Sequence, residues 1–404
     1  MKSRIVPLHQ LTGDDIAAWQ RLAQECSNPN PLFEPSCLIP SAQHLIHGDE
    51  FLLVIAEEGG VFFGCLPLMR VASKVRPSNS WAGVRRRVYS SQLRRLRYDG
   101  TPLLRASRGV EAVSAILGEL RARATMGAPA ILVLEAVDLD GVAARYLIEA
   151  AAALGAPCYQ YRTWVRPVVR RREEPSYRHL SGGKSDQKLA KLRRQLGREL
   201  GGDVRVVERH DDPSAIEQLL QLEAAGYKSL LRVDMNSHVG EPQWFREMCA
   251  AFRAERRLSL YSLQVEDCVV AMNLLVRGGD CLFGLQTVFD ERYAKYSPGL
   301  QLEVDVIDRF HHDTDAMLLD SCTFEGNETM LQIYPDRRQV ATFILAVGGR
   351  GTRLYLRAAM TVNQILGDQS ALRRRWPRLY HFVNSAATRV LLPRRAAQVT
   401  HPEE

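Results

Sequence analysis

The sequence predicts an α/β (α+β) fold made of two similar domains in tandem, each with a mixed, mostly antiparallel sheet flanked by helices. Three observations support this prediction. The chain of 404 residues is too long for one small core. Residues 51–70 and 258–277 share one pattern, in which two apolar strands flank an acidic turn and a basic residue follows. Each pattern then leads to an Asp-containing loop, a helix and a short buried strand, at 131–134 and 316–319.

The first copy is read from periodicity and turn residues. A helix is expected over 14–25, because Ile16, Trp19 and Leu22 recur at helical spacing. Glu57-Glu58-Gly59-Gly60 separates two apolar runs and predicts a hairpin. The elements expected to complete this copy are a helix at 110–124, a strand at 131–135, a helix at 142–154 and an extended segment at 158–169.

The second copy follows a polar, breaker-rich segment, which we take as the domain boundary. Its expected elements are a basic helix at 185–200 stopped by Gly201-Gly202, a strand at 204–208, a helix from Asp212-Pro213 to about Tyr227, a hairpin over 258–276, a strand at 282–288, a helix from Pro298 to His311, a short strand ending in Asp320, and a last strand at 339–347. The predicted domains are therefore 1–170, 171–348 and a basic helical extension at 349–404.

Composition places the chain among soluble globular proteins, with 46% hydrophobic and 25% charged residues. No apolar run approaches the length of a membrane span, and the first residues lack the apolar core of a signal peptide. The eight cysteines are scattered, without a C-x-x-C pair or a histidine at ligand spacing. We therefore expect no disulfide framework, no metal and a cytoplasmic location, with peripheral association at the inner face of the membrane as the alternative.

The net charge of +7 comes from local clusters. No acidic residue lies between Glu58 and Asp99, where arginines such as Arg85, Arg86 and Arg87 accumulate, and a second basic run follows Arg350. Such clusters attract nucleic acid, anionic lipid or phosphorylated substrates. The alternative is a solvated arginine-rich surface.

The stretch 282–310 carries the clearest ligand-binding pattern. An apolar strand leads through a loop with Arg292 and Lys295 to Ser297-Pro298-Gly299, where Ser297 is expected to cap a helix that starts at Pro298. Gly299 is expected to leave the first turn open to a ligand. Uncovered N–H groups at a helix start bind anions, so the pattern predicts an anion site. The alternative is an ordinary capped helix.

Two motifs carry a resemblance to a known family. These are L-x-x-E-x-x-x-x-K, with Leu220, Glu223 and Lys228, and FDERYAKYSPGL at 289–300. In this order they resemble the GNAT acyltransferases, in particular the CelD-like group of cellulose and exopolysaccharide biosynthesis, which is related to the FemAB aminoacyl transferases. The chain departs from the family by lacking a glycine-rich pyrophosphate loop, and 327–330 reads Asn-Glu-Thr-Met where relatives often carry a Tyr-Lys pair.

The resemblance implies two GNAT-like domains and an acyl donor such as acetyl-CoA. It implies that the pantetheine of the donor lies between two splayed strands and that the pyrophosphate meets a helix N-terminus. The residues that this places at the donor are Gln286, Thr287, Val288, Lys295, Ser297, Pro298, Gly299 and Leu300.

Three residues are candidates for chemistry, because acyl transfer needs a base for the acceptor and a proton for the leaving thiolate. Glu223 lies on the apolar stripe of its helix, and a buried carboxylate is typical of a general base; the alternative is an ion pair with Lys228. Asp320, at a strand end, is a second candidate base, with turn capping as the alternative. Tyr296 is a candidate acid, with a core or stacking role as the alternative.

The sequence thus predicts an acyl-CoA-dependent N- or O-acyltransferase with a sugar, amino-sugar or amino-acid-derived acceptor. By resemblance it acts in polysaccharide or envelope assembly. One alternative is a FemAB-type transferase in which the helix at 185–200 contacts the phosphates of aminoacyl-tRNA. Another is a degenerate GNAT scaffold that binds anionic membrane through 350–395.

Overall fold

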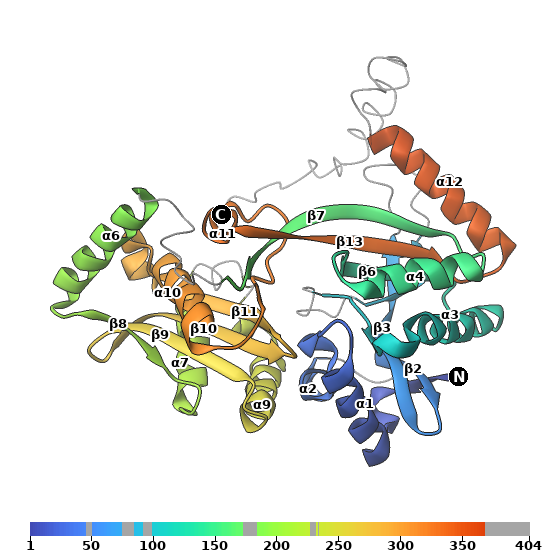
Figure 1. The fold of residues 1–404 in the computed structure, drawn as a ribbon, viewed down its shortest axis with the longest axis horizontal. Coiled ribbons are helices and arrows are strands. Elements are labelled where there is room, and N and C mark those ends of the chain that lie inside the picture. The colour runs from blue at the N-terminus through green and yellow to red at the C-terminus, as the bar shows by residue number, and fades with distance from the viewer. Residues whose placement is uncertain are drawn as a thin grey trace, which may run out of the picture.

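The computed structural model describes residues 1–45, 51–74, 85–91, 99–172, 184–226, 232 and 234–367. Its sheet is continuous across both halves of the chain (Figure 1). The strand order is β1-β2-β3-β4-β6-β13-β7-β12-β11-β10-β9-β8, with the short β5 paired to β3. Most neighbours are antiparallel, and the pairs β4–β6 and β11–β12 are parallel. The predicted fold class, a mixed and mostly antiparallel sheet flanked by helices, is confirmed.

The first half contains the predicted elements, together with the helix α2 and the strands β1, β4 and β5, which the sequence analysis missed. Its helices and strands are β1 (Lys2–Pro7), α1 (Gly13–Glu25), α2 (Pro35–His44), β2 (Phe51–Glu58), β3 (Val61–Lys74), β4 (Arg85–Ser90), β5 (Leu103–Leu104), α3 (Gly109–Thr125), β6 (Ile131–Asp138), α4 (Val142–Ala153) and β7 (Cys158–Arg170).

The second half repeats this plan. Its elements are α6 (Lys184–Leu200), β8 (Val204–Glu208), α7 (Ser214–Ala225), α9 (Glu241–Ala254), β9 (Leu258–Val265), β10 (Cys268–Gly278), β11 (Cys281–Phe289), the 3₁₀ helix η6 (Glu291–Tyr296), α10 (Pro298–Asp313), β12 (Leu318–Asp320), α11 (Glu328–Ile333), β13 (Asp336–Ala346) and α12 (Arg350–Gly367). Helices α6 and α10 cover one face of this part of the sheet, and α7 and α9 cover the other (Figure 1).

Local chemistry explains where these elements begin and turn. Thr12 and Asp15 form a reciprocal capping box at the start of α1. Gly59 and Gly60 both have positive φ in the β2–β3 turn, a conformation that side chains disfavour. At the end of α6, Gly201 has a φ of 76° and the Gly202 N–H donates to the Gly197 carbonyl, which is a Schellman ending.

The two halves are joined by an exchange of strands. The long strands β7 and β13 pair with each other from Cys158–Leu345 to Val168–Asp336. Strand β13 also pairs with β6 of the first half, and β7 pairs with β12 of the second half. Each half therefore contains a strand supplied by the other, and the sheet crosses the predicted boundary near residue 170.

A second contact between the halves is made by α2 and α9, two helices that the sequence analysis did not predict. Cys37 of α2 contacts the sulfur of Met248 in α9 at 3.8 Å, and just outside these helices Arg257 binds Glu34 at 2.5 Å. Both helices begin with a proline in the first turn, a signal that could have revealed them.

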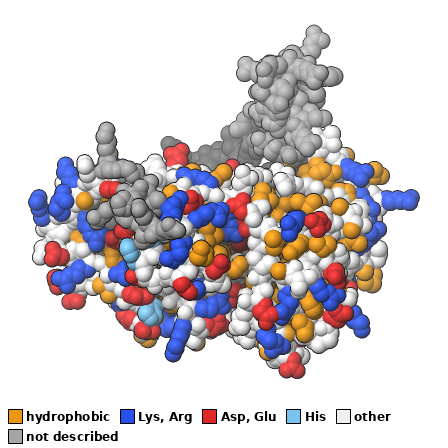
Figure 2. All heavy atoms as spheres, in the orientation of Figure 1, with side chains coloured by type: hydrophobic (Ala, Val, Ile, Leu, Met, Phe, Trp, Pro, Cys, Tyr) orange, Lys and Arg blue, Asp and Glu red, His pale blue; other side chains and the backbone are white. Residues whose placement is uncertain are grey.

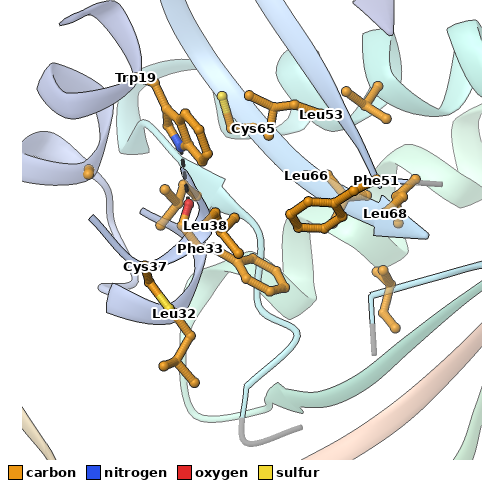
Figure 3. Close-up of a cluster of buried hydrophobic side chains, with 14 of the residues drawn as sticks. Trp19, Leu32, Phe33, Cys37, Leu38, Phe51, Leu53, Cys65, Leu66 and Leu68 are labelled. Carbon is orange, nitrogen blue, oxygen red and sulfur yellow. Dashed lines mark hydrogen bonds between the residues drawn. The ribbon is translucent and has the colours of Figure 1, made fainter. Parts of the chain in front are cut away.

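The largest core cluster lies mainly in the first half (Figure 3). Trp19 of α1 is fully buried, and its indole Nε1 donates to the Phe33 carbonyl at 3.0 Å. Phe33 and Leu38 pack in the same cluster as Phe51 and Leu68, which belong to the strands β2 and β3 (Figure 3). A separate cluster in the second half packs α6 and α10 against β9–β11. In the described residues, no helix is both long and apolar enough to cross a membrane.

Candidate acyl-donor site

The strands β11 and β12 separate shortly after they meet. Their register covers only Cys281–Phe283 against Leu318–Asp320, whereas β11 continues to Phe289. In the pairing with β10, Leu274 faces Gln286 and Leu275 faces Gly284, so Leu285 is an extra, bulged residue. A bulge bends and twists its strand. The edge of β11 after Phe283 is thus left without a β12 partner, at residues that are only half-buried from Gly284 to Thr287.

One predicted donor residue and one predicted base meet on the α7 face of this strand. Glu223 is 3% exposed, and its Oε1 accepts a hydrogen bond of 2.6 Å from Gln286 Nε2. Its Oε2 accepts one of 3.0 Å from the Met235 backbone N–H. The sequence analysis did not predict this last contact. Lys228, the predicted alternative partner, lies outside the described residues.

The next residue of β11 points to the opposite face, as strand geometry requires. Thr287 Oγ1 donates to Glu303 Oε1 at 2.5 Å, and Asn273 Nδ2 donates to the same oxygen at 3.0 Å. The Tyr334 hydroxyl donates to Glu303 Oε2 at 3.0 Å. Burial raises the pKa of Glu303, and the hydrogen bonds that it accepts offset part of this rise.

Sequence reasoning missed Glu303, Asn273 and Tyr334, although a signal for Glu303 existed. It is on the apolar stripe of α10, three residues before Val306 and seven before Phe310. The same argument singled out Glu223 on α7. Tyr334 follows α11 and reaches Glu303 only through the tertiary fold, so no local pattern marked it.

The start of α10 differs from the prediction in two respects. Ser297 is at the N-cap position in the left-handed region (φ 54°), and its side chain accepts no hydrogen bond from the helix. Gly299 is buried, and a Cβ there would lie 3.1 Å from Phe289 Cδ1. The expectation that Gly299 leaves the first turn open to a ligand is therefore wrong on the side where its Cβ would lie. Phe289 occupies the space that a side chain would take there.

The basic residues before this helix are paired within the protein. Arg292 binds Asp290 at 2.6 Å, and Lys295 lies 3.6 Å from Glu199. The Tyr296 hydroxyl also donates to Glu199, at 2.9 Å, and Lys295 lies over the Tyr296 ring. These contacts favour the stacking alternative for Tyr296 over the role of an acid.

Asp320 lies in a buried ionic centre between the two halves. Its Oδ1 accepts from the Cys322 N–H at 2.8 Å, so the turn-capping alternative is confirmed. Arg338 is 2.7 Å from Asp320, and Arg166 is 3.4 Å from it. Burial alone would raise the pKa of Asp320, but the two guanidinium groups and the Cys322 amide lower it. A carboxylate held in this way is a weak proton acceptor, which argues against the predicted catalytic role.

The residues of this ionic centre lie at equivalent positions in the two copies of the internal repeat. Arg166 and Arg338 face each other in the β7–β13 register, and Arg338 also binds Asp138 at 2.6 Å. Asp138 ends β6 as Asp320 ends β12, and each caps the N–H two residues on, at Asp140 and Cys322. Asp99 is also buried near these arginines. Burial raises the pKa of Asp99 to about 6, although the positive charges of Arg338 and Arg166 act to lower it.

The cysteines, the expected absence of a metal and the arginine clusters are the remaining predicted features. All eight cysteines are free thiols. Across the described ranges, no three His, Cys, Asp or Glu side chains are grouped to hold a metal ion. The side chains of Arg85, Arg86 and Arg87, and the basic segment after residue 367, lie outside the described part.

Comparison with known proteins agrees with this geometry. Residues 183–323 match the family described as acetyltransferase (GNAT) domain. The matched range contains the separated strands, Glu223 and the start of α10. No curated protein has a matching sequence. The CelD-like grouping is not among these findings.

Solved structures share the fold over most of the chain. The crystal structure of FemX is 8% identical and has a TM-score of 0.55, over 85% of this chain and 97% of that one. A conserved protein of unknown function from Bacteroides thetaiotaomicron is 13% identical with a TM-score of 0.52, over 83% and 97%. The C-terminal domain of a putative lysylphosphatidylglycerol synthetase from Agrobacterium fabrum is 11% identical with a TM-score of 0.50, over 89% and 96%. At such identities the likeness concerns the fold alone.

Proposed function

We propose that this protein transfers an acyl group from an acyl-CoA to an amine or hydroxyl group, with the donor bound between β11 and β12. The observation that carries the proposal is the early end of the β11–β12 pairing together with the bulge at Leu285. An unpaired strand edge offers backbone N–H and C=O groups to an extended ligand. The amide groups of pantetheine have the spacing and polarity to use such an edge.

Within this proposal, Gln286, Thr287 and Val288 line the arm of the donor. Its pyrophosphate meets the first turn of α10, where Pro298 lacks an N–H and the amides of Gly299 and Leu300 are the first donors. Lys295 and Ser297 flank this turn. Glu223 is the proposed base, because its carboxylate is buried and Gln286 links it to the donor strand.

The acceptor is proposed to be a sugar or an amino-acid-derived molecule in polysaccharide or envelope assembly, in the cytoplasm, as the CelD-like resemblance implies. Aminoacyl-tRNA is the alternative donor. A scaffold without activity, docked on anionic membrane, is the alternative to an enzyme.

A thermal-shift series with acetyl-CoA, longer acyl-CoAs and free CoA tests the donor class. A ligand at 100 times its dissociation constant stabilises the folded state by about 2.7 kcal/mol. Stabilisation by one acyl-CoA, and its loss in a variant that fills the gap at Gly284, would support the proposal. No shift with any CoA compound, together with aminoacylation-dependent binding of tRNA, would favour the alternative donor. No shift with either class would favour the scaffold.

A further inference from the structure

A second candidate site lies at the outer edge of the sheet, between the end of α6 and the start of β8. It is a shallow hollow of about 580 Å³, lined by Arg193, Arg194, Arg198 and the Gly201-Gly202 turn, with Asp203 as its acidic member. Figure 2 shows Lys and Arg side chains gathered at the left end of the molecule, where Figure 1 places α6 and β8. The proposed acyl transfer does not use this feature.

Two of the three arginines are available to a ligand. Arg193 is engaged, since it binds Asp305 at 2.5 Å and donates to the Val204 carbonyl. Arg194 and Arg198 are exposed, and no carboxylate of the described residues lies within ion-pairing distance of them. Asp203 offsets one charge, so the hollow has an excess of positive charge.

The positive charge continues along the helix. Lys188 and Lys191 are also exposed and have no acidic partner among the described residues, and with Arg194 and Arg198 they are spaced by three, three and four residues. This spacing places all four on one side of α6, over about 15 Å of helix. The opposite side is anchored, because Leu192, Leu196 and Leu200 pack into the second-half core.

We propose that this hollow binds a phosphoryl group, and that Lys188 and Lys191 extend it for a soluble ligand that carries several phosphates. The planar guanidinium forks of Arg194 and Arg198 match phosphate oxygens in bidentate geometry. The Gly202 N–H already satisfies the Gly197 carbonyl, which reduces the negative charge that a helix end would present to an anion.

A bilayer surface fits these observations less well. Leu192, Leu196 and Leu200 of α6 face the core and are not offered for insertion into a bilayer. The arginines also line a hollow. A phosphate on a flexible chain can enter it more readily than a phosphate held in the flat surface of a membrane can. The proposed pyrophosphate position, at the first turn of α10, is close to this helix, because Glu199 of α6 contacts Lys295 and Tyr296 just before that turn. Competition by free CoA therefore tests whether the hollow is a separate site.

Calorimetry with inorganic tripolyphosphate on the full chain tests the site without any acyl donor. The variant Arg194→Gln/Arg198→Gln should bind tripolyphosphate at least about tenfold more weakly, because it removes both available forks. The matched control Arg21→Gln/Arg121→Gln removes the same charge from exposed positions on α1 and α3 and should bind like the parent. All four substitutions are at exposed sites, so equal melting temperatures should confirm folding.

The source of the phosphates is distinguished by a labelled single-stranded oligonucleotide. The ligand is a nucleic-acid chain if the oligonucleotide binds more tightly than tripolyphosphate and the variant Lys188→Gln/Lys191→Gln lowers that affinity and flattens its salt dependence. If it binds more weakly, the ligand is a small polyphosphate. The proposal is overturned if tripolyphosphate does not bind, if the control variant loses as much affinity, or if free CoA competes for the hollow. Binding only to phosphatidylglycerol vesicles would also overturn it.

Discussion

The two parallel strand junctions, β4–β6 in the first half and β11–β12 in the second, occupy equivalent places in the repeat but are built differently. After Ser90 pairs with Val133, the Glu135 N–H donates to Ser91 Oγ, and the chain returns at Gly100 so closely that a Cβ there would lie 2.2 Å from the Glu135 carbonyl oxygen. At β11–β12, a Cβ on Gly284 would lie 3.5 Å from the Asp320 carbonyl oxygen, an ordinary contact. The first junction is closed by its own chain, and the second is open.

The equivalent helices of the two halves, α1 and α7, differ in the same direction. The buried residues of α1 are all apolar, whereas α7 buries Glu223 among apolar neighbours. The hydrogen bonds from Gln286 and the Met235 N–H offset the cost of burying this carboxylate, and they hold a proton acceptor beside the open junction. We infer that the first half stabilises the fold and the second half carries the chemistry.

The largest effect is expected at Glu223. Glu223→Gln should lower acyl-transfer turnover by roughly 10²–10⁴-fold while acyl-CoA affinity stays nearly unchanged, because a base acts mainly in the transition state. The measurements are steady-state kinetics and calorimetry.

The exchanged pair Glu223→Gln/Gln286→Glu is the matched control. It restores an amide–carboxylate contact but moves the carboxylate to the strand. If it restores melting temperature without turnover, Glu223 is a base. Normal turnover in Glu223→Gln would instead show a structural role.

The ionic centre tests how strongly the halves depend on each other. Arg338→Met leaves Asp138 and Asp320 buried without their shared partner and should cost about 3–5 kcal/mol in denaturant unfolding. Arg166→Met should cost less, because its contact with Asp320 is longer, at 3.4 Å. A larger cost for Arg166→Met would contradict the central position of Arg338.

Asp99 and Asp290, which begin equivalent loops in the repeat, should respond to pH with opposite signs. Since burial raises the pKa of Asp99 to about 6, the folded state retains a proton that the unfolded chain loses near pH 4. This group therefore destabilises the fold progressively as pH rises from about 4 to 6, by about 3 kcal/mol in total. Asp99→Asn should remove that slope in unfolding measurements from pH 4 to 8.

Asp290 provides the comparison for this titration. The Arg292 guanidinium lowers the pKa of Asp290, so its contribution is present above about pH 4 and is lost as pH falls further. Asp290→Asn should therefore reduce stability at neutral pH and have less effect in acid. The same slope in both variants would exclude this assignment.

The smallest effects come from one substitution made at both junctions. Gly100→Ala should destabilise by about 1–3 kcal/mol through overpacking against Glu135. Gly284→Ala should leave the melting temperature almost unchanged and weaken acyl-CoA binding by about tenfold, because its methyl group enters the open junction. Unchanged affinity in Gly284→Ala would place the donor elsewhere.

The sequence by itself determined the local elements and the internal repeat. Alternating apolar residues, the Gly59-Gly60 turn and Pro298 act over a few residues, so hairpins and helix starts could be read directly. The position of Glu223 on an apolar stripe was visible for the same reason, and its contact with Gln286 joined two predicted residues.

Only the tertiary structure decided how these elements meet. The exchange of β7 and β13 pairs residues such as Arg166 and Arg338, which are far apart in the chain and share no local pattern. The Glu303 network likewise draws on β10, β11, α10 and the residue after α11. Gly299 shows the limit most clearly: the sequence could specify a residue without a side chain, but the fold decided that Phe289 would occupy the space beside it.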